Sequence, residues 1–169
     1  MKYLPTAFGQ LAFAWKLYNY GLNGLINPNE LDAEVTFEDD DITFVIPKAL
    51  GQPEDLLIAL ENNLTIAFGA ASITLNRVRE EIGLGLPDPI ESENEQCIAI
   101  IYQVRKAFAH DIAEPKWEIR DRYRRRYEFG GMQFDLSGLH GEAFRYEHIG
   151  GPDKFYAIKD YFSRSFGAI

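Results

Sequence analysis

The longest regular pattern in the chain covers residues 53–80. Apolar residues recur there at spacings of three and four, along one side of a helix: Leu57, Leu60, Leu64, Phe68, Ala71, Leu75 and Val78. Pro53 suits the first helical position, and Glu54 and Asp55 suit the positive end of the helix dipole. The pattern predicts a long helix whose apolar side packs against another helix, in the same chain or in a partner.

Two further helices are predicted, one before and one after this segment. The first covers residues 6–20, where apolar residues again follow the helical period. The second begins at a capping box formed by Ser92 and Glu95 and runs to about Ile112. Together the three helices predict a helical bundle over residues 6–113.

A short β-hairpin is predicted between the first two helices. Its apolar residues alternate on both sides of an acidic turn at residues 38–41, and they are Val35, Phe37, Ile42, Phe44 and Ile46. The four consecutive acidic residues could bind calcium, but the spacing of an EF-hand loop is absent. A solvated turn is therefore the preferred interpretation.

From residue 117 onward the apolar period becomes strand-like. Trp117, Ile119, Tyr123, Tyr127 and Phe129 occupy odd positions, while Arg120, Arg122, Arg124 and Arg126 occupy even ones. Gly130-Gly131 predicts a turn into a second strand over residues 132–136, and a third short strand is expected over 144–148. A closing helix is predicted from Pro152 to about Phe162.

The length of 169 residues fits a single domain. The expected fold class is α+β, a mainly helical bundle with a small C-terminal antiparallel sheet and a closing helix over residues 116–165. A net charge of −9 disfavours non-specific binding to nucleic acid or to an anionic membrane, although a local basic site is compatible with it.

Composition also sets expectations for cofactors and location. Cys97 is the only cysteine, so neither an intramolecular disulfide nor a cysteine-based zinc site can form from it alone. No unbroken apolar segment reaches the length needed to span a bilayer. We therefore expect a cytoplasmic protein without a cofactor.

One stretch, YQVRKAFAHDIAEPKW at residues 102–117, carries the candidate chemistry. On a helical wheel Arg105 falls inside the apolar stripe, where its guanidinium requires a carboxylate, backbone carbonyls or an external anion. His110 lies roughly 140° from Arg105 on a straight helix. The two side chains can therefore meet only if the helix end unwinds or if a second subunit supplies one of them.

The segment QVRKAFAHDI, residues 103–112, resembles the motif of the HEPN superfamily. Those helical domains are usually dimeric and carry an arginine, four to six residues and then a histidine, and many members read RNxFAHD. The resemblance implies a metal-independent endoribonuclease with its motif at a homodimer interface between long helices. Arg105 would hold the scissile phosphate, and His110 would transfer a proton as the ribose 2′-hydroxyl attacks.

The resemblance leaves a second function open. Lys106 stands where active members usually have Asn, Asp or His. Many relatives bind RNA or a protein partner without cleavage. The alternative interpretation is therefore a catalytically silent helical interaction or dimerisation module whose partner is unknown, with Arg105 in a structural ion pair.

Basic residues outside the motif form a candidate phosphate or RNA site. One member of this candidate site is Lys106, which follows Arg105 directly. The others are four arginines that alternation would place on one strand face: Arg120, Arg122, Arg124 and Arg126. Alternation also places Tyr123 and Tyr127 on the opposite, buried face. A solvated face whose arginines are neutralised by nearby acids is the other interpretation.

A last cluster contains His140, Glu142, Glu147 and His148. Imidazoles and carboxylates are metal ligands, but these positions need not converge across a hairpin. The sequence predicts no metal site here. It also lacks a Gly-x-Ser-x-Gly nucleophile and a phosphate-binding glycine loop.

Overall fold

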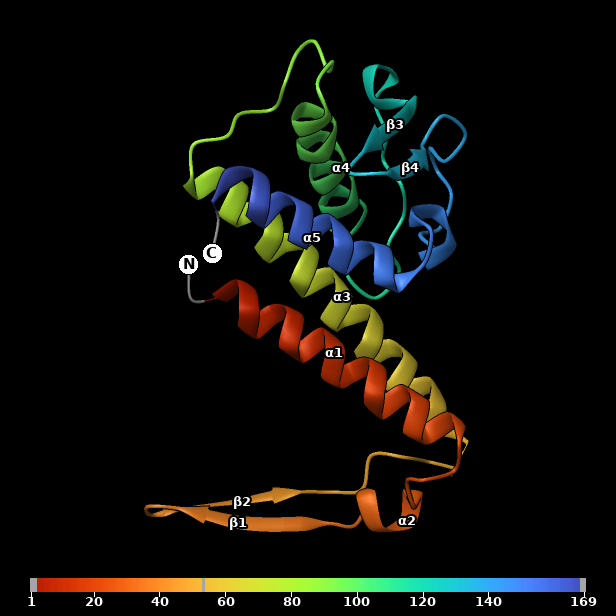
Figure 1. Ribbon diagram of the computed structural model, residues 1–169. Helices are drawn as coiled ribbons and strands as arrows, with labels where there is room; N and C mark the ends of the chain where they lie inside the picture. The colour runs from red at the N-terminus through yellow and green to blue at the C-terminus, as the bar shows by residue number, and fades with distance from the viewer. Residues whose placement is uncertain (1–2, 53, 168–169) are drawn as a thin grey trace. The chain divides into compact units, whose positions relative to one another are not determined.

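The computed structural model describes residues 3–52 and 54–167 and shows a mainly helical α+β fold, as expected from the sequence (Figure 1). Within these ranges the α-helices are α1 (Tyr3–Leu22), α2 (Pro28–Leu31), α3 (Asp55–Glu81), α4 (Glu93–Ala107) and α5 (Pro152–Phe166). Two antiparallel hairpins are formed by β1 (Val35–Asp39) with β2 (Ile42–Ile46) and by β3 (Arg126–Phe129) with β4 (Met132–Asp135). The proposed helical start at Pro53 lies outside the described residues.

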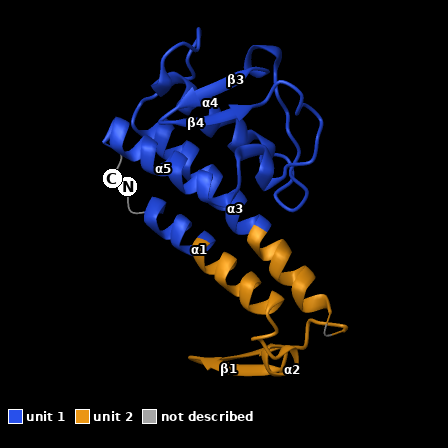
Figure 2. Cartoon of the chain, turned by 45° about the vertical axis from the view of Figure 1, so that its right-hand side comes forward, with its two compact units in different colours: residues 1–11, 65–169 blue, residues 12–64 orange. Residues whose placement is uncertain are grey.

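The chain divides into two compact units (Figure 2). Unit 1 contains residues 1–11 and 65–169, and unit 2 contains residues 12–64. The predicted parts 6–113 and 116–165 remain predictions, and unit 1 contains residues of both. In unit 1, α4 contacts both β3 and α5.

The core of unit 1 is built around the side chain of Phe68 on α3, which is completely buried. Its ring centroid lies 4.4 Å from that of Phe155 on α5 and 5.4 Å from that of Phe108 at the end of α4. It also lies 5.3 Å from that of Phe144 and 5.2 Å from that of Tyr146. One residue therefore joins α3, α4, α5 and the loop before α5.

Unit 2 contains the second half of α1, α2, the β1–β2 hairpin and α3 as far as Leu64. A Cβ atom on Gly21 would lie 2.5 Å from Cδ1 of Leu60, so α1 and α3 approach closely within this unit. The Asp32 carboxylate accepts hydrogen bonds from the backbone N–H groups of Ala49 (2.7 Å) and Leu50 (3.1 Å). These bonds close the base of the hairpin.

α3 confirms the long predicted helix. Six of the seven residues of the predicted apolar stripe are buried, among them Leu64, Phe68 and Leu75, whereas Leu57 is 38% exposed. By length and composition α3 is also the one described helix that could cross a membrane, a test that the core helix of a soluble protein passes as well.

α4 confirms the predicted start but not the predicted end. Ser92 Oγ accepts from the Glu95 N–H, and Glu95 Oε2 accepts from the Ser92 N–H at 2.7 Å, which is the expected capping box. The helix ends at Ala107 rather than near Ile112. The Phe108 N–H donates to the Arg105 carbonyl three residues earlier, and the Lys116 N–H donates to the Ala107 carbonyl at 3.0 Å.

The prediction of one strand over residues 117–129 is wrong, although the predicted burial pattern is right. Tyr123 and Tyr127 are each only 1% exposed, and the even-numbered arginines are exposed. However, a 3₁₀ turn at Asp121–Tyr123 interrupts the extended chain, and only Arg126–Phe129 forms a strand. The turn brings the Tyr123 ring to 5.8 Å from that of Tyr102 on α4.

Of the remaining C-terminal predictions, the glycine turn and the closing helix are confirmed, and the third strand is wrong. Gly130 and Gly131 both have positive φ angles, 56° and 73°, in the turn between β3 and β4. The third strand expected over 144–148 is absent: a lone bridge joins Lys116 to Ala143, and a 3₁₀ turn follows over Tyr146–Ile149. α5 confirms the closing helix and extends it to Phe166.

Gly69 on α3 permits the close packing of the segment that follows α4. A Cβ atom there would lie 2.6 Å from Cγ1 of Ile112 and 2.8 Å from Cδ1 of Phe108. We expect Gly69→Ala to lower the free energy of unfolding by about 1–3 kcal/mol through overpacking, despite the higher helix propensity of alanine. Urea denaturation measures this change.

Gly9→Ala on α1 is the matched control, because nothing lies within 4 Å of the Cβ position there. It should raise the free energy of unfolding by about 0.5–1 kcal/mol. Equal stabilisation of both variants would contradict a tight contact at Gly69.

Candidate functional site

The turn that follows α4 determines where His110 lies. Asp111 Oδ1 accepts hydrogen bonds from the backbone N–H groups of Ala113 (2.8 Å) and Glu114 (3.0 Å). These two bonds, with that from Glu114 as the larger contribution, lower the pKa of the Asp111 carboxyl. They hold residues 111–114 in a turn, and His110 lies between this turn and the end of α4 at Ala107, outside the helix that carries Arg105.

A carboxylate contacts His110. Glu118 Oε2 lies 3.2 Å from His110 Nε2 and 3.7 Å from Lys106 Nζ. Lys106 Nζ also donates to the Glu118 backbone carbonyl at 2.8 Å. Lys106 therefore holds the segment after Pro115 against α4, and Glu118 places a negative charge beside the imidazole.

Arg105 is half-buried near the end of α4. Within the described part of the chain its guanidinium makes neither a hydrogen bond nor an ion pair, so the structural ion pair considered from the sequence is not seen there. Its charge acts on Arg79, a buried arginine of α3 whose pKa is lowered chiefly by desolvation. Arg79 is itself bound to Asn76 and Glu80.

His110 lines a small hollow of about 150 Å³ together with Ala107, Asp111, Glu114, Lys116 and Glu118. Arg105 is not among these residues. The segment after α4 thus places His110 beside Glu118, and this hollow does not bring the two motif residues together.

A neighbouring hollow of about 400 Å³ gathers several of the predicted basic residues. We call it the basic hollow, and it is lined by Lys106, Glu118, Ile119, Arg120, Asp121, Arg124 and His140. The Arg120 guanidinium has no hydrogen bond or ion pair to any described residue. Arg124 donates to the Ile119 carbonyl at 3.2 Å and lies 3.2 Å from Asp121 Oδ1.

His140 adds a donor that sequence reasoning did not assign to this site. Its Nδ1 accepts a hydrogen bond from the Ile119 N–H at 3.1 Å. The neutral ring must therefore carry its proton on Nε2. Only tertiary structure brings His140 to this site, because it follows Ile119 by twenty-one residues and shares no local pattern with it.

The other predicted arginines lie elsewhere. Arg122 pairs with Asp88 at 2.8 Å and donates to the Tyr123 hydroxyl at 2.7 Å. Arg126 pairs with Asp135 across the β3–β4 hairpin at 3.0 Å. The prediction of a single face for the four arginines is therefore wrong, because the 3₁₀ turn at residues 121–123 separates them.

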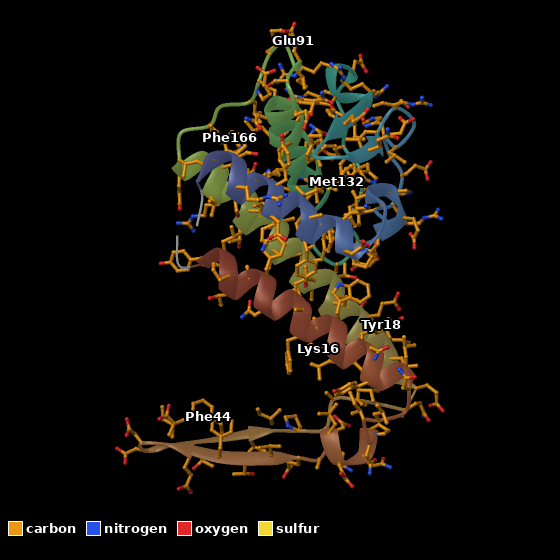
Figure 3. The ribbon with its side chains drawn as sticks, viewed as in Figure 1. Lys16, Tyr18, Phe44, Glu91, Met132 and Phe166 are labelled. Atoms are coloured by element: carbon orange, nitrogen blue, oxygen red, sulfur yellow. The ribbon has the colours of Figure 1, made fainter. Side chains whose placement is uncertain are left out.

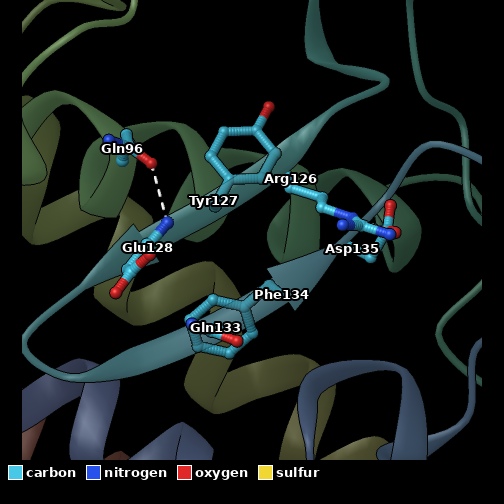
Figure 4. A pocket seen from close by; sticks show the side chains of 7 residues that line it. All are labelled: Gln96, Arg126, Tyr127, Glu128, Gln133, Phe134 and Asp135. Carbon is cyan, nitrogen blue, oxygen red and sulfur yellow. Dashed lines mark hydrogen bonds and ion pairs between the residues drawn. The ribbon is translucent and has the colours of Figure 1, made fainter.

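A larger hollow of about 530 Å³ lies over the β3–β4 hairpin and α4 (Figure 4). The Glu128 N–H donates to Gln96 Oε1 at 2.8 Å across it. Its arginine, Arg126, is paired with Asp135, and Glu128 adds another negative charge. This hollow is therefore less suited to an anion than the basic hollow, despite its size.

The two histidines of the predicted C-terminal cluster accept hydrogen bonds rather than converge. His148 Nδ1 accepts from Trp117 Nε1 at 2.9 Å and from the Arg145 N–H at 3.2 Å, while His140 binds the Ile119 N–H. Among the described residues no group of three or more His, Cys, Asp or Glu side chains could hold a metal ion. Burial of Cys97 raises the pKa of its thiol, which disfavours a thiolate nucleophile.

Comparison of the chain with family models, with curated proteins and with solved structures gave no match.

His148 gives the fold a pH dependence whose sign follows from its hydrogen bonds. Burial, and next the Arg145 charge, lower the pKa of His148, and Glu147 and Glu142 oppose them. The unfolded chain, with a histidine pKa of about 6.5, therefore takes up the proton first. Stability is complete above that pH and decreases as the pH falls through it, because protonated Nδ1 can no longer accept from Trp117.

We expect His148→Asn, which keeps an acceptor but cannot titrate, to lose less stability than the wild type between about pH 8 and about pH 5. Urea unfolding midpoints at the two pH values measure the difference. Identical pH dependence in the two proteins would contradict the assignment.

Proposed function

We propose that this chain is a HEPN-like RNA-binding protein that contacts the phosphate backbone at the basic hollow. The observation that carries the proposal is the gathering of Arg120, Arg124 and His140 in one hollow with Lys106, the residue that follows Arg105. Cationic side chains and N–H donors are the groups that bind phosphate oxygens. The hollow is open to solvent, as contact with an extended polymer requires.

The distribution of charge supports this proposal. Residues 12–64, which form unit 2, contain ten Asp or Glu and two Lys, a net charge of −8 out of −9 for the whole chain. Unit 1 is thus almost neutral. Within it, residues 105–126 contain eight Lys or Arg and four Asp or Glu, a net charge of +4. Repulsion of a polyanion therefore comes from unit 2, not from the basic hollow.

Metal-independent cleavage is the further step of this proposal. It requires that Arg105 and His110 act on one phosphate, and two copies of the chain could provide this arrangement across a dimer. Ile66 and Ile73 on α3 are 45% and 38% exposed and lie seven residues apart, on the same side of the helix. They offer an apolar strip for the proposed homodimer through the long helices.

The second candidate is a catalytically silent interaction module. It is favoured by the apolar side chains that the β1–β2 hairpin of unit 2 exposes, which a protein partner could cover. RNA binding and cleavage by the full chain distinguish the two candidates.

The double substitution Arg120→Gln, Arg124→Gln should weaken binding of mixed-sequence single-stranded RNA by about tenfold or more, because each substitution removes a cation that faces the hollow. It should also reduce the slope of log affinity against log salt, by roughly 0.7 for each phosphate that the variant no longer neutralises. Fluorescence anisotropy across a salt series measures both.

The double substitution Arg122→Gln, Arg126→Gln is the matched control, because it also removes two charges from the same segment but outside the basic hollow. It should change affinity less than about twofold. Equal weakening by the two double variants would show that binding follows overall charge and would contradict the proposed site.

Cleavage is tested separately with the same RNA in the presence of a chelator. We expect wild-type protein to cut it and both Arg105→Ala and His110→Ala to lose at least about a hundredfold in rate. RNA binding without cleavage by folded wild-type protein would restrict the proposal to binding. Neither binding nor cleavage would favour the interaction module.

A further inference from the structure

The β1–β2 hairpin of unit 2 has one apolar face that is largely exposed. Its cross-strand pairs are Val35 with Ile46, Phe37 with Phe44, and Asp39 with Ile42, and members of a pair project from the same side of the sheet. The apolar members are 40–59% exposed and form what we call the hairpin face: Val35, Phe37, Ile42, Phe44 and Ile46. Figure 3 shows Phe44 projecting from this hairpin.

The hairpin face is ordered by contacts of its own. The rings of Phe37 and Phe44 stack with centroids 5.0 Å apart and an interplanar angle of 15°. Asp32 binds the backbone beyond β2 and so closes the base of the hairpin. Two strands alone are marginally stable in water, and neither strand pairs with a third within the described residues. A partner that covers the face would supply the missing burial.

Charge decides between possible partners. The hairpin tip carries Glu38, Asp39, Asp40 and Asp41, and none of them forms an ion pair with a described residue. Unit 2 as a whole has a net charge of −8, from ten acidic and two basic residues. A second unit 2, a nucleic acid or an anionic membrane would be repelled. A cationic polypeptide would be attracted.

We propose that the hairpin face docks a basic polypeptide that presents apolar side chains beside lysine or arginine. The apolar side chains cover the Phe37–Phe44 stack, and the cationic ones reach the carboxylates of the tip. Each strand has five residues and spans about 17 Å, so an extended segment of similar length matches the face. This surface belongs to unit 2 and does not depend on RNA binding by unit 1.

The test uses a short synthetic peptide that alternates lysine with valine and phenylalanine. Titrated into full-length ¹⁵N-labelled protein, it should shift amide resonances of residues 35–46 and bind with an affinity that falls as salt increases. A peptide with glutamate in place of lysine is the charge control and should not bind. Absence of binding by the lysine peptide, or equal binding by both peptides, would overturn the proposal.

Two sets of variants separate the apolar and charged contributions. Phe37→Ser, Phe44→Ser should weaken binding about tenfold or more, whereas Phe13→Ser, which removes an exposed phenylalanine from α1 (62% exposed), should not. Asp40→Asn, Asp41→Asn leaves the apolar side chains in place and should lower both affinity and salt dependence. Unchanged binding by both double variants would overturn the proposal.

Analytical ultracentrifugation of the protein without peptide tests whether a second copy of this chain covers the hairpin face instead. The proposal expects that Phe37→Ser, Phe44→Ser leaves the oligomeric state unchanged. Concentration-dependent self-association that these substitutions abolish would assign the face to a second copy of this chain and would overturn docking of a basic partner.

Discussion

Burial of the Phe68 ring is the interaction on which unit 1 depends. Its ring contacts come from α3, α5, the end of α4 and the loop that precedes α5. Phe108, one of these contacts, is also the C-cap residue that directly follows α4. The position of the candidate site is therefore a consequence of core packing: Phe108 turns inward to the cluster, and the residues that follow it, including His110, turn outward to solvent.

Local patterns predicted most of the elements, because the interactions that define them lie within a few residues of one another. The capping box at Ser92, the turn at Gly130-Gly131 and the alternating burial through Tyr123 and Tyr127 are of this kind. The end of α4 is not, because Lys116 satisfies the Ala107 carbonyl from nine residues away. The helix propensities of the residues in α4 cannot predict this hydrogen bond, and so they cannot predict where the helix ends.

The candidate site was less predictable than the fold for the same reason. Alternation correctly placed the arginines outside, but it could not separate Arg120 and Arg124 from Arg122 and Arg126, because each pair meets different neighbours in the folded chain. His140 reaches the site only through a backbone hydrogen bond to a distant segment. Net charge also conceals how charge is distributed, since nearly all of it belongs to unit 2.

The acidic tip of the β1–β2 hairpin has a consequence for how the protein behaves at high concentration. Two strands with free edges and an exposed apolar face are a template for intermolecular sheet growth, and flanking charges are how natural chains prevent it. Glu38–Asp41 would then act as gatekeepers against aggregation. High salt, which screens these carboxylates, should promote aggregation through residues 35–46.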